Sequence, residues 1–340
     1  MKALPTLLCF VAAAIAPIAP IAAQPVPVLS PPDGIRRGEP GIATLALPAL
    51  GGPAGAYELS VRYADGTDGP IYRGFAAPRL GPGIAALGRD IPTEGPSAAP
   101  VSGAVVLFLL SAPIAAPLGE ASMVARAPDG EAVAGARFYI GDREFGRQDL
   151  RLDQALTSIR IDPDPVKTEQ AIRYQALLSS VDPTAAFLDS GFSMPVASER
   201  RTTLFGMRRR YIYADGGVEA STHSGVDYGC PTGSPVVAPG RGRVVMIEDR
   251  IVTGKTVILE HLPGTYSIYM HLDRFDPGLT LGAVVPRGAP LGAVGMTGLA
   301  TGPHLHWELR VMGQACDPEA LVGLDKVPWI RTIVPAIEGR

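Results

Sequence analysis

Glycine and proline interrupt this chain throughout, with 40 glycines and 34 prolines among 340 residues. Both residues weaken the interior of helices and strands and favour turns, so the regular elements must be short and joined by many reversals. Runs rich in β-branched and aromatic residues lie between these turns, as is typical of strands. The pattern predicts a mainly β protein, and the length favours two domains over one compact core.

The first part of the mature chain is expected to form a β-sandwich over residues 24–140, of the immunoglobulin-like type. Asp65-Gly66 and Asp129-Gly130 indicate hairpin-like reversals within it. It contains no histidine and no catalytic constellation, which leaves four roles open: positioning, binding a regulatory protein partner, controlling access to a site, or spacing alone. Five runs are expected to be strands: Ile42–Leu47, Tyr57–Tyr63, Val105–Leu110, Ser122–Arg126 and Arg137–Ile140.

Residues 141–200 are predicted to form a connector with one short helix. Asp164 is a residue type that caps helix N-termini, and Pro165 suits the first helical position. The helix is therefore expected to run from Pro165 to about Leu178.

The first 23 residues have the features of a secretory signal peptide. Lys2 supplies a positive charge, an apolar run follows, and Ile21-Ala-Ala23 offers small side chains before a cut that leaves Gln24 first. The apolar run at 101–118 is interrupted by a glycine and two prolines and is shorter than the ~20 residues that span a bilayer. The mature chain is therefore expected to be exported and to have no transmembrane segment.

The charge pattern argues against nucleic acid as a partner. The formal net charge is −3, so no positive field covers the chain as a whole. One local basic cluster occurs just before the histidine-bearing stretch. It is expected to be solvated surface, with contact to substrate carboxylates as the alternative. Its members are Arg200, Arg201, Arg208, Arg209 and Arg210.

All five histidines fall within residues 223–306, together with candidate carboxylate ligands. His223 and Asp227 are four residues apart, and His304 and His306 are two apart. Even separations share a face of a β-strand, so each pair can converge if its segment is extended. Three of these four groups can occupy three corners of a tetrahedron around Zn²⁺ and leave the fourth open, as in catalytic zinc sites.

The same stretch, over roughly residues 205 to 325, resembles the lysostaphin/LytM-like zinc metalloendopeptidases, which cut peptide bonds in bacterial peptidoglycan and have the duplicated hybrid motif fold. The matching pieces occur in the family's order. They are His223-Ser-Gly-Val-Asp227, Pro231 to Pro239, Gly242-Arg-Val-Val245, Gly254 to His261, Tyr269-Met-His-Leu272 and the glycine-rich run from Leu291 to Glu308. The resemblance implies a catalytic domain at 201–325 built on an antiparallel sheet, followed by a C-terminal tail at 326–340.

Carried over residue by residue, the resemblance implies one Zn²⁺ held by His223, Asp227 and His306, with His271 and His304 as catalytic residues beside it. Which of those two histidines is the general base stays open. His261 lies in a strand-like run, and a structural or supporting role is expected for it rather than direct metal binding.

Cys230 and Cys316 are the two cysteines that remain once the signal segment is removed. An even pair in an exported protein favours a disulfide, and two buried free thiols are the alternative.

Together these features predict an exported zinc metalloendopeptidase that acts on cross-links or stem peptides of peptidoglycan. Its expected location is the periplasm. The alternative is a catalytically silent regulator that binds peptidoglycan and activates another cell-wall hydrolase. A zinc hydrolase acting on a different small peptide or a lactam would use the same metal chemistry.

Overall fold

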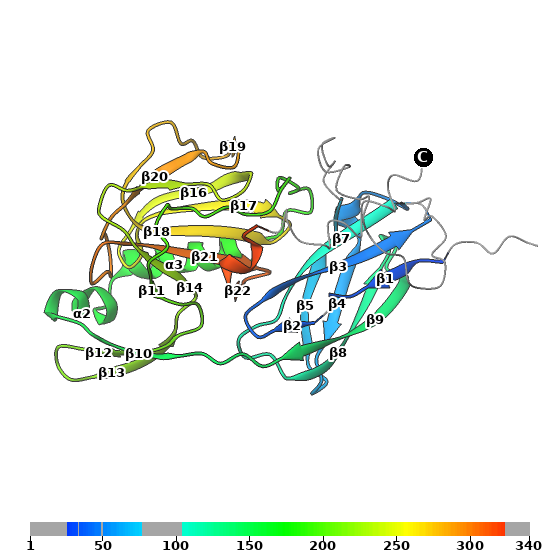
Figure 1. Cartoon of the computed structure of the whole chain (residues 1–340), viewed down its shortest axis with the longest axis horizontal. Coiled ribbons are helices and arrows are strands. Elements are labelled where there is room, and N and C mark those ends of the chain that lie inside the picture. The colour runs from blue at the N-terminus through cyan, green and yellow to red at the C-terminus, as the bar shows by residue number, and fades with distance from the viewer. Residues whose placement is uncertain (1–25, 33, 49, 77–103, 324–340) are drawn as a thin grey trace, which may run out of the picture.

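The computed structural model describes residues 26–32, 34–48, 50–76 and 104–323, and it confirms the mainly β fold. Figure 1 shows two bodies side by side, one formed by the N-terminal strands and one by the strands after residue 200. The expected signal segment at 1–23 and the expected tail at 326–340 lie outside the described residues. Among the described residues, every helix is too short or too polar to cross a membrane.

The N-terminal body contains two sheets, of strand order β1-β3-β7-β6 and β2-β9-β8-β4-β5. Their pairings are antiparallel except for β2 with β9. Buried residues alternate along β8, where Ala121, Met123 and Ala125 point inward, as expected for a strand with one covered face. Residues from both sheets, such as Leu45 and Leu59, belong to one hydrophobic core. All five expected strands are present. The bounds are β1 Val28–Ser30, β2 Ile35–Arg36, β3 Pro40–Leu47, η1 Ala54–Ala56, β4 Glu58–Arg62, β5 Asp68–Arg73, β6 Phe75–Ala76, β7 Ala104–Ser111, β8 Gly119–Arg126 and β9 Ala132–Gly141.

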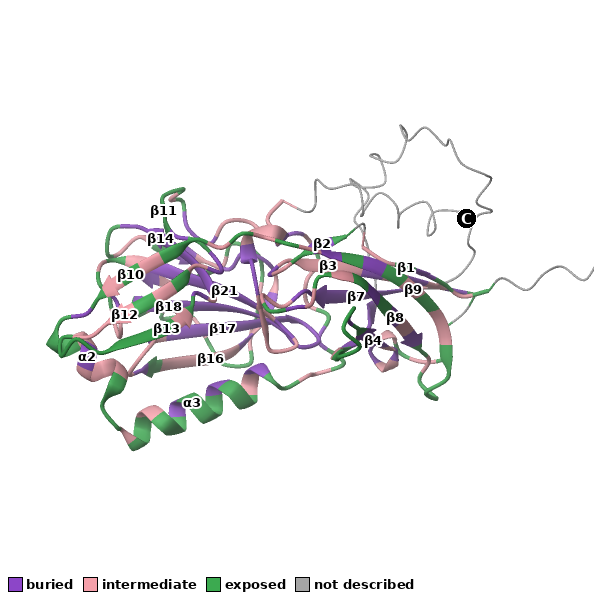
Figure 2. Cartoon of the chain, turned by 90° about the horizontal axis from the view of Figure 1, so that it is seen from below, coloured by how far each residue is buried: buried purple, intermediate pink, exposed green. Residues whose placement is uncertain are grey.

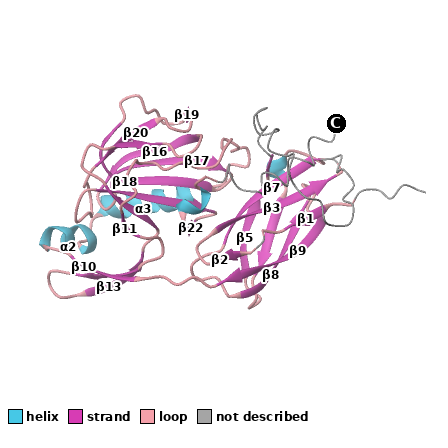
Figure 3. Cartoon of the chain, in the orientation of Figure 1, coloured by secondary structure: helices cyan, strands magenta, loops and turns pink. Residues whose placement is uncertain are grey.

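The connector contains more regular structure than the sequence predicted. The expected helix is α3, Pro165–Leu178, and its N-cap Asp164 accepts hydrogen bonds from the backbone N–H groups of Val166 (2.7 Å) and Lys167 (3.1 Å). Two further elements, β10 (Arg147–Arg151) and α2 (Gln154–Ile161), were not predicted. β10 pairs in parallel with β12 and so joins a three-stranded sheet, β10-β12-β13. Figure 3 shows this small sheet and α2 at the end of the molecule away from the N-terminal strands.

The second body is built on a ten-stranded antiparallel sheet with the main order β11-β14-β21-β18-β17-β16-β19. Its central strands are buried on both faces, as Figure 2 shows for β17 and β21. α3 covers part of one face, where Tyr174 and Leu178 pack with Ile258, Ile268 and Met270. The bounds are β11 Arg201–Thr203, β12 Arg208–Ile212, β13 Val218–Thr222, β14 Gly225–Gly229, β15 Pro235–Val237, β16 Gly242–Arg250, β17 Gly254–Leu262, β18 Thr265–Phe275, β19 Val284–Val285, β20 Pro290–Val294, β21 His304–Val311, β22 Gln314–Cys316 and η3 Pro318–Leu321.

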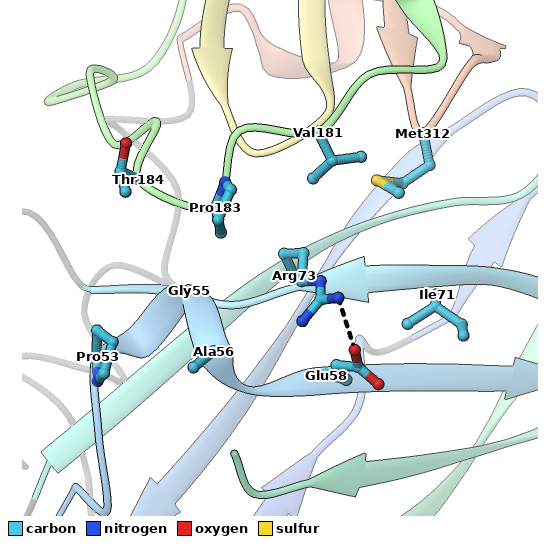
Figure 4. A pocket seen from close by; sticks show the side chains of 10 residues that line it. All are labelled: Pro53, Gly55, Ala56, Glu58, Ile71, Arg73, Val181, Pro183, Thr184 and Met312. Carbon is cyan, nitrogen blue, oxygen red and sulfur yellow. Dashed lines mark ion pairs between the residues drawn. The ribbon is translucent and has the colours of Figure 1, made fainter. Parts of the chain in front are cut away.

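The two bodies meet along a seam that includes polar contacts. Asp317 donates its backbone N–H to the Gly38 carbonyl oxygen at 2.7 Å, and its carboxylate lies 2.7 Å from Arg143. A cavity of about 500 Å³ opens between the bodies, with Val181 and Met312 on one side and Ile71 on the other. Figure 4 shows its one drawn ion pair, Arg73 with Glu58. The lining is mostly apolar and contains no histidine or cysteine, so this cavity lacks the groups expected of a metal site.

Candidate functional site

Three neighbouring strands of the large sheet carry four of the five predicted site residues. Asp227 on β14 lies directly opposite His306 on β21, and His306 in turn lies opposite Met270 on β18, one residue before His271. His223 lies in the short gap between β13 and β14, outside any strand. Its backbone N–H donates to the Met207 carbonyl oxygen at 2.9 Å, so the residue just before β12 holds His223 in place.

His223, Asp227 and His306 converge on one point and are all buried. His223 Nε2 lies 3.0 Å from Asp227 Oδ1 and 3.0 Å from His306 Nδ1, and His306 Nδ1 lies 2.7 Å from Asp227 Oδ1. Two imidazole nitrogens and one carboxylate oxygen are the donor set of a three-ligand catalytic zinc site. These residues, which the sequence predicted as ligands, can therefore hold a metal ion.

The second nitrogen of each of these imidazoles has a partner that can only accept. His223 Nδ1 lies 2.8 Å from the Leu204 carbonyl oxygen, and His306 Nε2 lies 2.9 Å from Glu308 Oε1. Each of these nitrogens carries a proton, so when the imidazole is neutral, as a metal ligand must be, the lone pair lies on the converging nitrogen. Such outer partners orient the imidazoles of metal sites and make them more basic. The residues therefore fit Zn²⁺ in tautomer as well as in type.

Two buried carboxylates, Asp227 and Glu308, contact the imidazole of His306. Burial lowers the pKa of His306, but its hydrogen bonds to Asp227 and Glu308 outweigh burial and raise that pKa to about 9. Burial alone would raise the pKa of Asp227, whereas the hydrogen bonds with His223 and His306 hold it well below its usual range. The two carboxylates thus draw positive charge toward His306, and a divalent cation between the three donors meets the same field.

His271 and His304 lie next to this cluster and line the same cavity. The ring centroid of His271 is 4.8 Å from that of His304 and 6.1 Å from that of His306. Each ring donates Nδ1–H to a backbone carbonyl oxygen at 2.8 Å, His271 to Thr297 and His304 to Gly302. Burial lowers the pKa of both rings, that of His271 to about 3, so both are neutral near pH 7 with Nε2 as the acceptor.

The backbone of His271 is unusual, because its φ of 61° lies in the left-handed region that few residues other than glycine adopt. Two hydrogen bonds hold it there, from its N–H to the Thr253 carbonyl oxygen and from its ring to Thr297. Backbone strain of this kind persists where the surroundings over-determine it, and it often marks functional positions.

The cavity above these residues has a volume of about 310 Å³. The four predicted site residues other than His223 line its floor, residues 299–303 of the glycine-rich run form one wall, and the three-stranded sheet β10-β12-β13 forms another. That last wall, from Gln148, Leu150, Arg209 and Tyr211, was not predicted, because β10 itself was not predicted.

The predicted basic cluster does not act as one surface. Arg201 pairs with Glu319 and Arg210 with Asp149, while Arg209 turns inward to Asp227. Arg200 lines the cavity, and Arg208 lines a separate hollow on the far side of the small sheet.

The structure also bears on two other sequence predictions, those for His261 and for the two cysteines. His261 is fully buried, with Nδ1 2.8 Å from the Arg241 carbonyl oxygen and Nε2 2.7 Å from Ser267 Oγ, which gives it a structural role away from the metal donors. Trp307, which alternates with His306 along β21, is buried in the core. Cys230 and Cys316 are both free and buried, so the disulfide is not formed and the alternative of two thiols holds.

A mainly β domain with a convergent His-Asp-His set beside two further histidines is typical of a metallopeptidase site. More particularly, residues 221–318 match Peptidase family M23, and the chain contains a domain of that family. Over 129 residues it is 34% identical to the DD-carboxypeptidase/endopeptidase Mpg of Neisseria meningitidis, covering 38% of this chain and 28% of that protein. Over 92 residues it is 39% identical to the peptidoglycan DD-endopeptidase ShyA of Vibrio cholerae, covering 27% of this chain and 21% of that protein.

Similarity to a solved structure extends beyond the M23 segment. A crystal structure from Pseudomonas aeruginosa assigned to peptidase M23 has a TM-score of 0.50 at 25% identity, and the match covers 83% of this chain and 93% of that one. The curated relatives, by contrast, are matched over less than a third of their own length. Sequence similarity to them therefore concerns the M23 domain alone.

Proposed function

We propose that this protein is an exported zinc metalloendopeptidase that hydrolyses cross-links or stem peptides of bacterial peptidoglycan. The observation that carries the proposal is the convergence of His223, Asp227 and His306 at the floor of a cavity. Relatives that share the M23 segment are named as peptidoglycan endopeptidases, which supports peptidoglycan peptides as the substrate class.

Zn²⁺ held by the three donors would lower the pKa of a bound water and polarise the scissile carbonyl. His271 and His304 are the proposed catalytic residues. Both are neutral with Nε2 as the acceptor, so either can take a proton from water during attack. Once protonated, the same Nε2 becomes a donor toward the negative charge that develops on the substrate oxygen.

Export to the periplasm is part of the proposal. It is supported by the signal-like segment at residues 1–23 and by the location of the proposed substrate. We also retain the division into a β-sandwich at 24–140, a connector at 141–200, a catalytic domain at 201–325 and a tail at 326–340. A regulatory partner that binds the N-terminal domain remains part of this proposal.

The test is the release of soluble peptides from purified peptidoglycan sacculi by the mature chain, with and without zinc. His306→Ala should lose both bound zinc and peptide release. His271→Ala should keep its zinc, because this side chain is outside the donor set, while release falls by about 10²–10⁴-fold. His261→Gln removes a histidine outside the cavity and should retain activity. Mass spectrometry of the products would identify the bond that is cut.

The alternative of a silent regulator makes the opposite prediction. A folded, zinc-loaded protein that releases no peptide, yet raises the activity of another cell-wall hydrolase, would replace the proposed enzyme. All five predicted site residues are present and face one another or the cavity, and no observation favours this alternative.

A further inference from the structure

The two oxygens of the Asp227 carboxylate have different partners. Oδ1 faces the imidazoles of His223 and His306 at 3.0 Å and 2.7 Å. Oδ2 accepts a hydrogen bond of 2.5 Å from a terminal nitrogen of the Arg209 guanidinium. The side chains of Asp227 and Arg209 are 6% and 12% exposed, so water screens this ion pair little.

Arg209 lies on β12 of the small sheet β10-β12-β13, and that sheet orients it. In the parallel register of β10 and β12, Gln148 lies opposite Arg209, and its Oε1 accepts a hydrogen bond of 3.0 Å from Arg209 Nε. Gln148 also lies 3.4 Å from Oγ1 of Thr203, the residue opposite Asp227 on β11. The guanidinium is therefore held from one side by β10 while it holds the carboxylate on the other.

The next residue along β12 provides a comparison. Arg210 points to the other face, as alternation along a strand requires. There it makes two hydrogen bonds with Asp149, of 2.9 Å and 2.7 Å, in an exposed pair. Neighbouring arginines on one strand thus form similar ion pairs, and only one of the pairs includes a metal donor.

We propose that Arg209 is a positioning residue that occupies Oδ2 of Asp227 and reserves Oδ1 for the metal, so that the small sheet β10-β12-β13, with its one connector strand β10, completes the metal site. The inference rests on the proposed zinc site. A carboxylate can turn about its terminal torsion and offer a cation either oxygen or both. The guanidinium removes that choice, because turning the carboxylate would break a charge-assisted hydrogen bond in a buried setting.

Two possible effects of the Arg209 guanidinium, fixing the Asp227 carboxylate and repelling the cation, change metal affinity in opposite directions. A guanidinium that acted only through its charge would repel the cation, and its removal would tighten zinc binding. A guanidinium that fixes the carboxylate makes binding tighter, and its loss should weaken zinc affinity by about 10–100-fold, the range typical of outer partners of metal ligands. The sign of the change therefore decides between the two roles.

The experiment measures zinc affinity of the mature chain by competition with a chelator, for the unaltered protein and for Arg209→Gln, Arg209→Lys and Arg210→Gln. Arg209→Gln should bind zinc about 10–100-fold more weakly. Arg209→Lys keeps the charge but not the forked geometry and should also be weakened, since an ammonium cannot bridge Gln148 and Asp227 as a fork does. Arg210→Gln should leave the affinity unchanged.

Visible absorption of the cobalt-substituted protein adds a readout that does not depend on activity, because it reports ligand number and geometry. The spectrum should change in Arg209→Gln and not in Arg210→Gln. Gln148→Leu leaves Arg209 in the chain and removes its support, and it should weaken zinc binding by a smaller factor. That variant keeps the test informative if loss of the arginine prevents folding.

Equal or tighter zinc binding in folded Arg209→Gln, together with unchanged affinity in Gln148→Leu, would overturn the positioning role while the zinc site stands. Absence of zinc binding in the unaltered protein would overturn both this inference and the proposed metal function. Weaker binding in Arg210→Gln equal to that of Arg209→Gln would also overturn it, because the effect would then come from the sheet as a whole.

Discussion

At the scale of single residues, the histidines differ in what their two ring nitrogens contact. The four beside the cavity each have one nitrogen held by a carbonyl or carboxylate oxygen and the other directed to the site. His261 has both nitrogens satisfied inside the core, by the Arg241 carbonyl oxygen and by Ser267, whose hydroxyl oxygen lies 2.7 Å from Tyr269 Oη. The same residue type therefore provides the proposed metal donors in one place and core structure in another.

His261 should make the stability of the protein depend on pH. Burial lowers its pKa from 6.5 to about 4 in the folded state. Between those values the unfolded chain binds the proton and the folded protein does not, so stability is lost as pH falls from about 6.5 toward 4. The full effect is about 3 kcal/mol. We expect unfolding free energies by denaturant titration at pH 7 and pH 5 to differ less in His261→Gln than in the unaltered protein.

The other buried histidines contribute to both proteins alike, so the comparison isolates His261. An identical pH dependence in His261→Gln and the unaltered protein would contradict a neutral, buried His261.

At the scale of elements, α3 connects the chain before the catalytic domain to the back of the large sheet. Tyr174 and Leu178 are buried against β17 and β18. Tyr174 Oη also lies 3.4 Å from Oε2 of Glu308, whose other oxygen contacts His306. The helix therefore packs directly behind Glu308, the hydrogen-bond partner of the proposed metal ligand His306.

Asp164→Ala should destabilise the protein by about 1 kcal/mol, because the N-cap carboxylate accepts from two backbone N–H groups that would otherwise lose their partner. Asp164→Asn keeps a side-chain acceptor and should remain close to the unaltered protein. The shift in denaturant midpoint measures both. Equal destabilisation by alanine and asparagine would mean that the carboxylate acts through its charge rather than as a cap.

At the scale of the whole molecule, the seam couples the N-terminal sheets to the catalytic body. Arg143 pairs with Asp317 at 2.7 Å and lies over the rings of Phe145 and Phe205, at 5.6 Å and 5.7 Å from their centroids. The Arg143 and Asp317 side chains are 22% and 11% exposed, so the pair lies between a surface ion pair and a buried one.

Arg143→Ala should lower the free energy of unfolding by more than the ~1 kcal/mol typical of breaking an exposed ion pair and by less than the ~5 kcal/mol of breaking a fully buried one. We expect it to separate the unfolding of the two bodies, visible as transitions that no longer coincide when near-UV and far-UV circular dichroism are compared. Arg137→Ala breaks an exposed pair with Glu120 and should change stability by less than ~1 kcal/mol. Equal changes in stability in the two variants, with unfolding transitions that still coincide, would indicate that the Arg143–Asp317 pair does not couple the unfolding of the two bodies.

The predictions that held depend on neighbours along the chain. The two-residue period placed His304 and His306 on one face of β21, and Asp164 with Pro165 marked the start of α3. The same argument could have predicted Glu308 at the site, because it lies two residues beyond His306 on that face. The extra strand of the connector could not be predicted in this way, since β10 is short, charged and stabilised by pairing with β12 far along the chain.

The sequence by itself determined which side chains could take part in the chemistry and which short segments carry them, because residue type, strand period and helix capping are properties of adjacent residues. Only the tertiary structure decided which nitrogen of each imidazole faces the proposed metal site. It also decided that Arg209 and Gln148 lie beside that site and that the two cysteines are not joined. Asp227 and His306 are 79 residues apart, and Gln148 and Arg209 are 61 apart. Contacts at such separations form only when whole strands pair and pack, and no local pattern along the chain specifies them.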